Sequence, residues 1–201
     1  MRNAAEWDER YASSELVWSA EPNRFVAELV DGLAPGRAID LAAGEARNSL
    51  WLARHGWNVT AVDYSKVGLD KGRQIAESLG IAGNLTFECA DLTEYVPAPG
   101  AYDLVLLAYL HLPPAERAVV VERAAVAVAP GGTLLIVGHD LDNLTGGVGG
   151  PQDPDVLYSV ERLLAGIDGA GLSVELAEQR LRPMEGKDRP AIDVVLLARR
   201  G

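Results

Sequence analysis

The sequence predicts a doubly wound α/β domain built on a seven-stranded, mostly parallel sheet whose last strand is antiparallel. Short apolar runs alternate with helical patterns along all 201 residues, and polar residues follow the ends of the runs. The last two runs are joined by a short connection without a helical pattern, so we expect them to pair antiparallel. The expected strands are 37–42, 57–62, 84–89, 102–107, 133–137, 172–179 and 191–198.

The expected helices have apolar faces and recognisable ends. One of them follows Ser65, which is a good N-cap residue, and precedes Gly80, which suits the C′ position. The stretch 138–155 has no periodicity and is rich in glycine, which is typical of a functional or mobile loop. The expected helices are 23–33, 46–55, 66–79, 114–129 and 156–170.

Length and composition indicate a single globular domain, comprising an N-terminal helical or lid segment (1–34) and an α/β core (35–201). No run approaches the ~18 apolar residues of a membrane span, and the N-terminus lacks an apolar leader, so we expect a cytoplasmic protein. Cys89 is the only cysteine. A disulfide framework and a cysteine-based metal site are therefore excluded within one chain, and the three histidines give no metal signature.

The net charge of −11 argues against a nucleic-acid partner, because such binding depends on lysine and arginine. One basic cluster is interleaved with acids, and we interpret it as a solvated loop. We expect neither a nucleic acid nor a membrane as partner, and either a monomer or a homodimer. The cluster comprises Arg180, Arg182, Lys187 and Arg189.

Candidate binding residues follow the ends of four successive strands, where open α/β sheets bind ligands. Asp40 and Gly44 belong to a tight turn after the first strand, where glycine lets the backbone approach a ligand. Asp63 ends the second strand, 19 residues after Gly44, which is the spacing at which a carboxylate reaches a ribose. Asp91 and Tyr109 follow the third and fourth strands. Each alone could be an ordinary turn or surface residue, but the four together predict a nucleoside pocket.

These segments read "AIDLAAGEARNSLWLA", "VTAVDYS", "ADL", "YDLVLLAYLHLP" and "VAPGGTLLIVGHD". From about residue 7 to 199 the chain resembles the class I S-adenosylmethionine-dependent methyltransferases, which have a Rossmann-like fold. Within them it is most similar to the small tellurite-resistance and thiopurine branch. The grounds are its compact size, its opening "WDERYASSELVWSAEPNRF" and its helix "GEARNSLWLARHGW".

The resemblance implies a role for each residue at this edge of the sheet. Ala42 and Ala46 stand where the superfamily usually has glycine, so a positive φ at either position would cost roughly 1 kcal/mol. The methionine end of the cofactor would be lined by Asp40, Ala42 and Gly44, assisted by Arg47 and Asn48. The ribose would be held by Asp63, and the adenine would be framed by Tyr64, Asp91 and Leu92. Ala108 and Tyr109 would lie near the sulfonium.

His111 and His139 follow the fourth and fifth strands and are the candidate general bases, since an unperturbed histidine titrates near neutrality. Alternatively, His111 packs under the cofactor and His139 holds the next loop. The aromatic residues before the first core helix would either cover the cofactor and exclude water or anchor a structural helix. The residues proposed for this lid and for the acceptor pocket are Trp7, Tyr11, Trp18 and Tyr158.

The resemblance implies in-line methyl transfer from S-adenosylmethionine to a small molecule such as a thiol, a metalloid oxyanion or a phenol, with S-adenosylhomocysteine as product. A general base is optional, because a thiolate needs none. Two alternatives remain open. One is a regulator that binds S-adenosylmethionine without catalysis. The other is a nicotinamide-dependent oxidoreductase, although the chain lacks both the Gly-x-Gly-x-x-Gly turn and a second catalytic domain.

Overall fold

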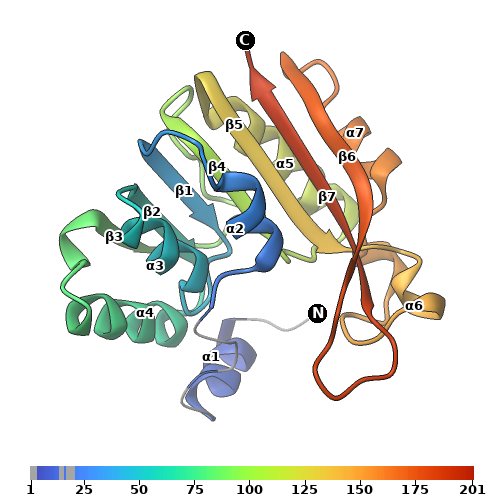
Figure 1. The fold of residues 1–201 in the computed structure, drawn as a ribbon, viewed down its shortest axis with the longest axis horizontal. Helices are drawn as coiled ribbons and strands as arrows, with labels where there is room; N and C mark the ends of the chain where they lie inside the picture. The colour runs from blue at the N-terminus through green and yellow to red at the C-terminus, as the bar shows by residue number, and fades with distance from the viewer. Residues whose placement is uncertain (1–3, 14–15, 17–20) are drawn as a thin grey trace.

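The computed structural model describes residues 4–13, 16 and 21–201. Within them, seven strands form one sheet in the order β3-β2-β1-β4-β5-β7-β6 (Figure 1). The strands from β1 to β5 pair in parallel, whereas β7 runs antiparallel to both β5 and β6. The predicted fold class and the antiparallel last strand are confirmed. The strands are β1 (Arg37–Leu41), β2 (Asn58–Asp63), β3 (Leu85–Cys89), β4 (Tyr102–Ala108), β5 (Val128–His139), β6 (Leu172–Arg182) and β7 (Ala191–Arg200).

Helices cover both faces of the sheet (Figure 1). One face carries α2, α3 and α4, with α1 packed against α4, and the opposite face carries α5 and α7. No helix in the described part of the chain is long and apolar enough to cross a bilayer. The helices are α1 (Ala4–Ala12), α2 (Arg24–Val30), α3 (Arg47–Arg54), α4 (Lys66–Ser78), η1 (Ala82–Asn84), α5 (Pro114–Ala127), α6 (Asn143–Gly146), η2 (Pro154–Val156) and α7 (Val160–Ile167).

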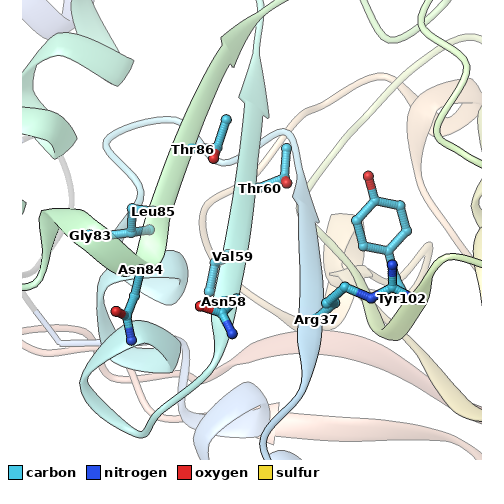
Figure 2. Close-up of a pocket in the computed structure, with 9 residues that line it drawn as sticks. All are labelled: Arg37, Asn58, Val59, Thr60, Gly83, Asn84, Leu85, Thr86 and Tyr102. Atoms are coloured by element: carbon cyan, nitrogen blue, oxygen red, sulfur yellow. The ribbon is translucent and has the colours of Figure 1, made fainter.

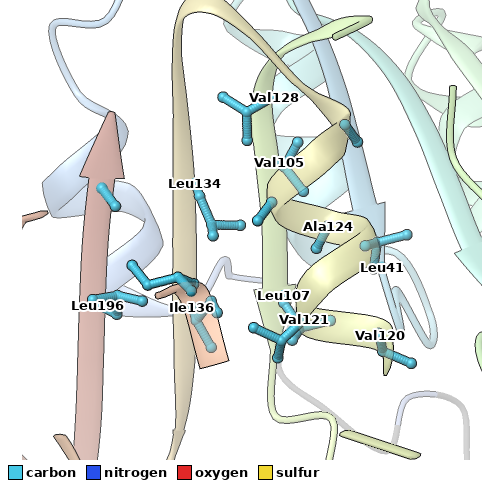
Figure 3. Close-up of a cluster of buried hydrophobic side chains, with 14 of the residues drawn as sticks. Leu41, Val105, Leu107, Val120, Val121, Ala124, Val128, Leu134, Ile136 and Leu196 are labelled. Carbon is cyan, nitrogen blue, oxygen red and sulfur yellow. The ribbon is translucent and has the colours of Figure 1, made fainter. Parts of the chain in front are cut away.

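Buried side chains alternate between the two faces of the central strands. On β4, Val105 and Leu107 join the cluster under α5, while Leu104 and Leu106 join the cluster under α2 and α3. Figure 3 shows α5 lying along β4 and β5, with Val121 directed toward the sheet. Fully burying one such aliphatic side chain contributes about 1.5–3 kcal/mol. Since both faces of β4 are covered, its sequence is a nearly continuous apolar run.

Several element boundaries differ from the prediction, and the starts of β5 and α7 differ most. The strand β5 begins at Val128 rather than at 133, because the Pro-Gly-Gly turn forms an irregularity inside the strand. Tyr102 pairs with Val128, and Leu104 already pairs with Thr133. The predicted helix 156–170 begins only at Val160, since the preceding residues form η2 and the Ser159 hydroxyl accepts a hydrogen bond from the first turn.

The turn between β1 and α3 is built from left-handed residues. Ala42, Gly44 and Ala46 have φ values of 66°, 58° and 61°. The backbone N–H of Ala43 donates to Val62, and that of Ala46 donates to Ala43. Both alanines therefore adopt the positive φ that the sequence analysis considered for these two positions. This conformation costs about 1–2 kcal/mol for each alanine.

The helix α4 approaches this turn along a stripe of glycines. A Cβ on Gly68 would lie 2.9 Å from the Gly44 carbonyl oxygen, and one on Gly72 would lie 2.8 Å from the Ala46 methyl group. Glycine inside a helix costs about 1 kcal/mol relative to alanine. Here its lack of a side chain allows the helix and the turn to pack directly together.

On the face opposite α4, the amino ends of β1, β2 and β3 are partly uncovered, because residues 90–101 form no helix between β3 and β4. A shallow pocket of about 190 Å³ lies there, at the amino ends of these strands. Figure 2 shows Thr60, Thr86 and Tyr102 on the strands that line it. Since ligands in open α/β sheets bind at the carboxyl ends, this pocket is at the wrong edge for a nucleoside.

The left-handed turn can be tested by relieving its strain. We expect Ala42→Gly to raise the free energy of unfolding by about 1 kcal/mol, or the melting temperature by about 2–4 °C, because glycine adopts positive φ freely. The matched control is Ala43→Gly in the same turn, whose φ is not positive and which should lose about 0.5–1 kcal/mol. Equal losses in both variants, measured by urea denaturation, would contradict the assignment of strain to position 42.

Candidate active site

Asp40 lies at the carboxyl end of β1 and is fully buried. Its Oδ2 accepts a hydrogen bond from the Ser49 hydroxyl at 2.6 Å, whereas its buried Oδ1 has no hydrogen-bond partner among the described residues. Burial raises the pKa of Asp40 to about 7, and the Ser49 hydrogen bond opposes this shift. An unpaired oxygen on a buried acid is costly, so the site is suited to a ligand cation or donor.

Asp63 ends β2 beside the left-handed turn. Its Oδ2 accepts the Gly44 backbone N–H at 2.9 Å, and its Oδ1 accepts that of Ser65 at 2.8 Å. Burial raises the pKa of this carboxyl, and the two backbone hydrogen bonds oppose the rise. A carboxylate offers about four lone-pair sites. Two of them hold the turn, and two remain for donors from a ligand.

The segment after β3 is closed by local hydrogen bonds. The Asp91 Oδ1 accepts both the backbone N–H and the hydroxyl of Thr93 at 2.8 Å. From α5, the Arg123 guanidinium donates to the carbonyl oxygens of Thr93 and Tyr95 at 2.8 and 3.1 Å. Leu92 is buried, while Asp91 is exposed and Tyr64, on the neighbouring strand end, is half-buried.

The N-terminal helix α1 is tied to the first turn of α4. The Asp8 Oδ1 accepts the Ser65 hydroxyl at 2.5 Å and the Val67 backbone N–H at 3.2 Å. Trp7 stacks on Tyr11 with ring centroids 5.4 Å apart, and Tyr11 is 4% exposed. These two aromatic residues therefore lie beside the Asp63 end of the site. Trp18 lies outside the described residues.

The start of α3 connects to the segment before α2. The Asn48 Oδ1 accepts the Asn23 backbone N–H at 2.8 Å, and both residues are buried. Arg47 is half-buried, and its burial lowers the pKa of its guanidinium, with the positive charge of Arg182 adding to this effect. Asp40 and Tyr109 act on Arg47 in the opposite direction. Arg47 thus brings a positive charge near the unpaired oxygen of Asp40.

Tyr109 follows β4 in a left-handed conformation with φ of 59°. Its hydroxyl donates to the Asp193 Oδ2 at 2.7 Å, and it accepts from the Asn23 Nδ2 at 3.2 Å and from the Arg182 Nε at 3.0 Å. Burial and the nearby Asp193 charge raise the pKa of Tyr109, so the phenol stays neutral. Ala108, just before it, is half-buried against the core.

Asp193, near the start of β7, joins this group and was not predicted from the sequence. Its side chain is fully buried, and its Oδ2 also accepts the Arg182 Nε at 2.6 Å. Burial alone would raise the pKa of Asp193, but its contacts with His139, Arg182 and Tyr109 outweigh this and lower it. The carboxylate is therefore charged and paired, as a buried charge must be.

The interpretation of Arg182 as part of a solvated loop is wrong. Its side chain is 21% exposed and lies over the Tyr109 ring, with the guanidinium carbon 5.4 Å from the ring centroid. The interpretation fails for Arg180 as well, because its side chain is 19% exposed and lies over the Phe25 ring, where it pairs with Glu28 and Glu178. Both arginines belong to β6, which continues to position 182 rather than ending at 179.

The two candidate bases lie together beside Tyr109. The rings of His111 and His139 stack with centroids 5.4 Å apart and planes 17° from parallel. His111 Nδ1 lies 3.0 Å from the Val156 carbonyl oxygen, and its buried Nε2 has no hydrogen-bond partner in the described part of the chain. Burial lowers the pKa of His111 to about 4. His139 Nδ1 lies 3.0 Å from the Asp193 Oδ1, at an angle short of an ideal hydrogen bond.

Tyr158 is placed behind His111 rather than on the surface of the loop. It is 1% exposed, its ring centroid is 5.6 Å from that of His111, and its hydroxyl donates to the Leu110 carbonyl oxygen. Burial raises the pKa of Tyr158. This position suits a support for His111 and does not suit a mobile lid.

The glycine-rich loop after β5 is anchored at several points. The buried Asn143 accepts the Ile192 backbone N–H and donates to the Gly149 carbonyl oxygen, both at 2.8 Å. From α5, Arg117 donates to the carbonyl oxygens of Asp155 and Leu157 at 3.0 and 3.2 Å. A Cβ on Gly150 would lie 2.6–2.9 Å from the His139 ring. The absence of a side chain at Gly150 lets the loop pack on that histidine.

Comparison with known proteins shows what the chain is similar to. Residues 38–132 match the family model described as "Methyltransferase domain". The chain is 28% identical to methyltransferase GfsG of Streptomyces halstedii over 183 residues, which cover 84% of this chain and 65% of that protein. It is 31% identical to ribosomal RNA small subunit methyltransferase C of Alcanivorax borkumensis over 110 residues, covering 52% and 33%. The chain thus spans between one third and two thirds of the length of these relatives.

Solved structures agree with the match. TehB from Haemophilus influenzae superposes with a TM-score of 0.75 at 16% identity, over 98% of this chain and 67% of that one. The geranyl diphosphate C-methyltransferase of Streptomyces coelicolor, solved with S-adenosyl-L-homocysteine, superposes with a TM-score of 0.69 at 13% identity, over 88% and 75%. At these identities the likeness concerns the fold alone.

The chain has the fold of the class I methyltransferases, and residues 38–132, just under half of it, are similar to a methyltransferase domain. S-adenosylmethionine is the cofactor of that class. The residues present fit this cofactor. The unpaired Asp40 oxygen suits the methionine ammonium group, the nearby Arg47 suits its carboxylate, and the remaining lone pairs of Asp63 suit two ribose hydroxyls.

The raised pKa of Asp40 makes stability depend on pH. The unfolded carboxyl titrates near 3.8 and the folded one near 7, so between these values the folded protein holds an extra proton and loses stability as pH rises. Asp40→Asn cannot ionise. We expect the variant to gain up to about 1.4 kcal/mol per pH unit relative to wild type between about pH 4 and 7, with no further gain above. A stability difference between variant and wild type that is independent of pH would contradict burial of the acid. The measurement is urea denaturation of the protein without cofactor.

Proposed function

We propose that this chain catalyses methyl transfer from S-adenosylmethionine to a small-molecule acceptor. The observation that carries the proposal is the meeting, at the carboxyl edge of the sheet, of the Asp40 and Asp63 carboxylates with the Tyr109 and histidine group. The two carboxylates would hold the cofactor. The Tyr109 and histidine group lies beyond these carboxylates, where strand β4 ends. We further propose a cytoplasmic location and a place in the tellurite-resistance and thiopurine branch, which the fold shared with TehB supports.

Bound S-adenosylmethionine supplies an activated methyl group on a positively charged sulfur. The chain's contribution is to align the acceptor with that group and to keep water out, which can be worth several kcal/mol. Ala108 and Tyr109 would lie near the sulfonium, and the adenine would rest between Tyr64 and Leu92. Tyr109 is suited to a fixed wall, because its hydroxyl has three hydrogen-bond partners.

The lid in this proposal is the N-terminal segment (1–34), in which α1 carries Trp7 and Tyr11. The Asp8 contacts with Ser65 and Val67 hold α1 against the end of the site that binds the ribose. His111 and His139 would serve the acceptor. Both lie beside Tyr109, with ring centroids 6.4 and 5.0 Å from its ring centroid.

RNA is the second acceptor class to consider, because one relative is a ribosomal RNA methyltransferase. The charge of this chain disfavours it. A net charge of −11 repels a phosphate backbone. Arg182, which the sequence groups with the basic cluster, is engaged with Asp193 inside the site.

An acceptor panel separates these classes. We expect S-adenosylhomocysteine to form with members of a panel of small phenols, thiols and metalloid oxyanions, and not with ribosomal or transfer RNA stripped of its methyl groups. Turnover of RNA alone would contradict the small-molecule assignment. Cofactor binding without turnover of any acceptor would indicate a non-catalytic regulator instead.

The ribose assignment predicts a loss of cofactor affinity in Asp63→Ala. Hydrogen bonds to a charged group contribute about 1.5–3 kcal/mol each, so we expect the dissociation constant for S-adenosylhomocysteine, measured by calorimetry, to rise at least tenfold. The control is Asp103→Ala, which also removes a carboxylate that accepts a backbone N–H, that of Arg37 at 2.7 Å, but at the opposite edge of the sheet. Unchanged affinity in folded Asp63→Ala, checked by circular dichroism, would count against the assignment.

A further inference from the structure

The imidazole rings of His111 and His139 each place Nδ1 next to an acceptor oxygen. A carbonyl oxygen only accepts hydrogen bonds, so the His111 Nδ1 facing the Val156 oxygen at 3.0 Å carries the proton. The His139 Nδ1 faces the Asp193 Oδ1 at 3.0 Å, where a lone pair would be repelled by the carboxylate. Both neutral rings therefore keep an unprotonated Nε2, and that of His111 is buried without a hydrogen-bond partner among the described residues.

The surroundings of the two rings differ in how well they stabilise a positive charge on the imidazole. His111 is surrounded by the His139 ring, the Tyr158 ring and the nearby Arg117, and burial disfavours its charged form. His139 lies against the charged Asp193, which can compensate the positive charge that a proton would add. The pair is thus divided into a ring that stays neutral and a ring that can accept a proton.

Asp193 also fixes the wall beside these rings. The same carboxylate that faces His139 accepts the Tyr109 hydroxyl and the Arg182 Nε. On its other side, His139 is covered by Gly150, where a side chain would not fit. The orientation of His139 is therefore set by β7 and by the glycine loop together.

A base of this kind is useful only for certain nucleophiles. A thiol ionises near pH 8.5 and reacts as the thiolate, whereas a phenolic hydroxyl ionises near pH 10 and stays protonated at neutrality. A neutral amine attacks through its own lone pair and can lose its proton afterwards. A hydroxyl is the acceptor that gains most from a base positioned before attack.

We propose that the acceptor is a small molecule bearing a hydroxyl group, that His139 Nε2 removes its proton, and that Asp193 is the positioning residue for His139. The inference rests on the proposed methyl transfer. The acceptor oxygen forms a bond to the methyl carbon as its proton passes to His139 Nε2, and the methyl–sulfur bond breaks with its electron pair remaining on sulfur. The imidazolium then returns its proton to water. His111 Nε2 accepts a hydrogen bond that orients the acceptor.

The test compares acceptors that differ in one atom. Phenols and thiophenols with the same ring substituents are assayed by S-adenosylhomocysteine formation with the wild type, Asp193→Asn, His139→Gln and the exposed control Asp188→Asn. We expect the first two variants to lose at least about a hundredfold in kcat on the phenols and less than tenfold on the thiophenols. The control should match the wild type on both.

Turnover confined to the thiols, or equal losses on both members of each pair, would overturn the hydroxyl assignment and leave methyl transfer intact. Absence of turnover of every acceptor, with cofactor bound, would contradict the proposed function itself.

A readout independent of the acceptor uses long-range ¹H–¹⁵N spectra of the imidazole nitrogens, with signals assigned by single histidine variants. We expect His111 and His139 to carry the proton on Nδ1 in the wild type. In Asp193→Asn, His139 should change to a mixture of tautomers while His111 stays unchanged. An Nε2–H tautomer of His139 in the wild type would overturn the inference whatever the turnover, and melting curves report whether each variant is folded.

Discussion

The arrangement of the site depends on the buried carboxylate of Asp193. Removing a charge from water is expensive unless the charge is paired. Three side chains from separate strand ends contact the Asp193 carboxylate. Tyr109 follows β4, His139 ends β5 and Arg182 ends β6, and each contacts an oxygen of Asp193 on β7. The carboxylate thereby fixes four strand ends relative to each other. Without it, the left-handed Tyr109 and the stacked histidines would have little to hold them.

The cofactor half of the site depends on a different constraint, which is backbone strain. Ala42 and Ala46 adopt a conformation that favours glycine, and the Asp63 carboxylate holds the turn between them through the Gly44 N–H. Residues kept in such conformations are typical of binding sites, where the surrounding structure compensates their cost. The turn is thus shaped before any ligand binds, which lowers the entropy lost on binding.

Local patterns in the sequence predicted the elements and the first half of the site. Ser65 caps α4 and Gly80 has a positive φ, as expected, because caps are decided by neighbouring residues. The sheet edge on which Asp40 and Asp63 lie followed from the order of strands and helices. The resemblance to methyltransferases followed from the quoted motifs, and the family model that matches residues 38–132 agrees with it.

The acceptor half could not be predicted in the same way, because it is made by long-range contacts. Tyr109 and Asp193 are 84 residues apart in the chain, and Arg182 is followed in sequence by charged residues that are exposed, such as Glu185 and Lys187. One signal was present: Asp193 interrupts the apolar run of β7, and an acid in a buried strand requires a partner. The sequence alone does not say which residue that partner is.

The glycines at positions 68 and 72 have a consequence for how this chain can vary. They occupy one face of α4, and the contacts of that face leave no room for a methyl group. The exposed face of the same helix has no such limit. Changes in amino-acid sequence should therefore accumulate on one side of α4 and be rejected on the other, since a single added carbon at either glycine would shift the backbone around Gly44 and with it the nucleoside pocket.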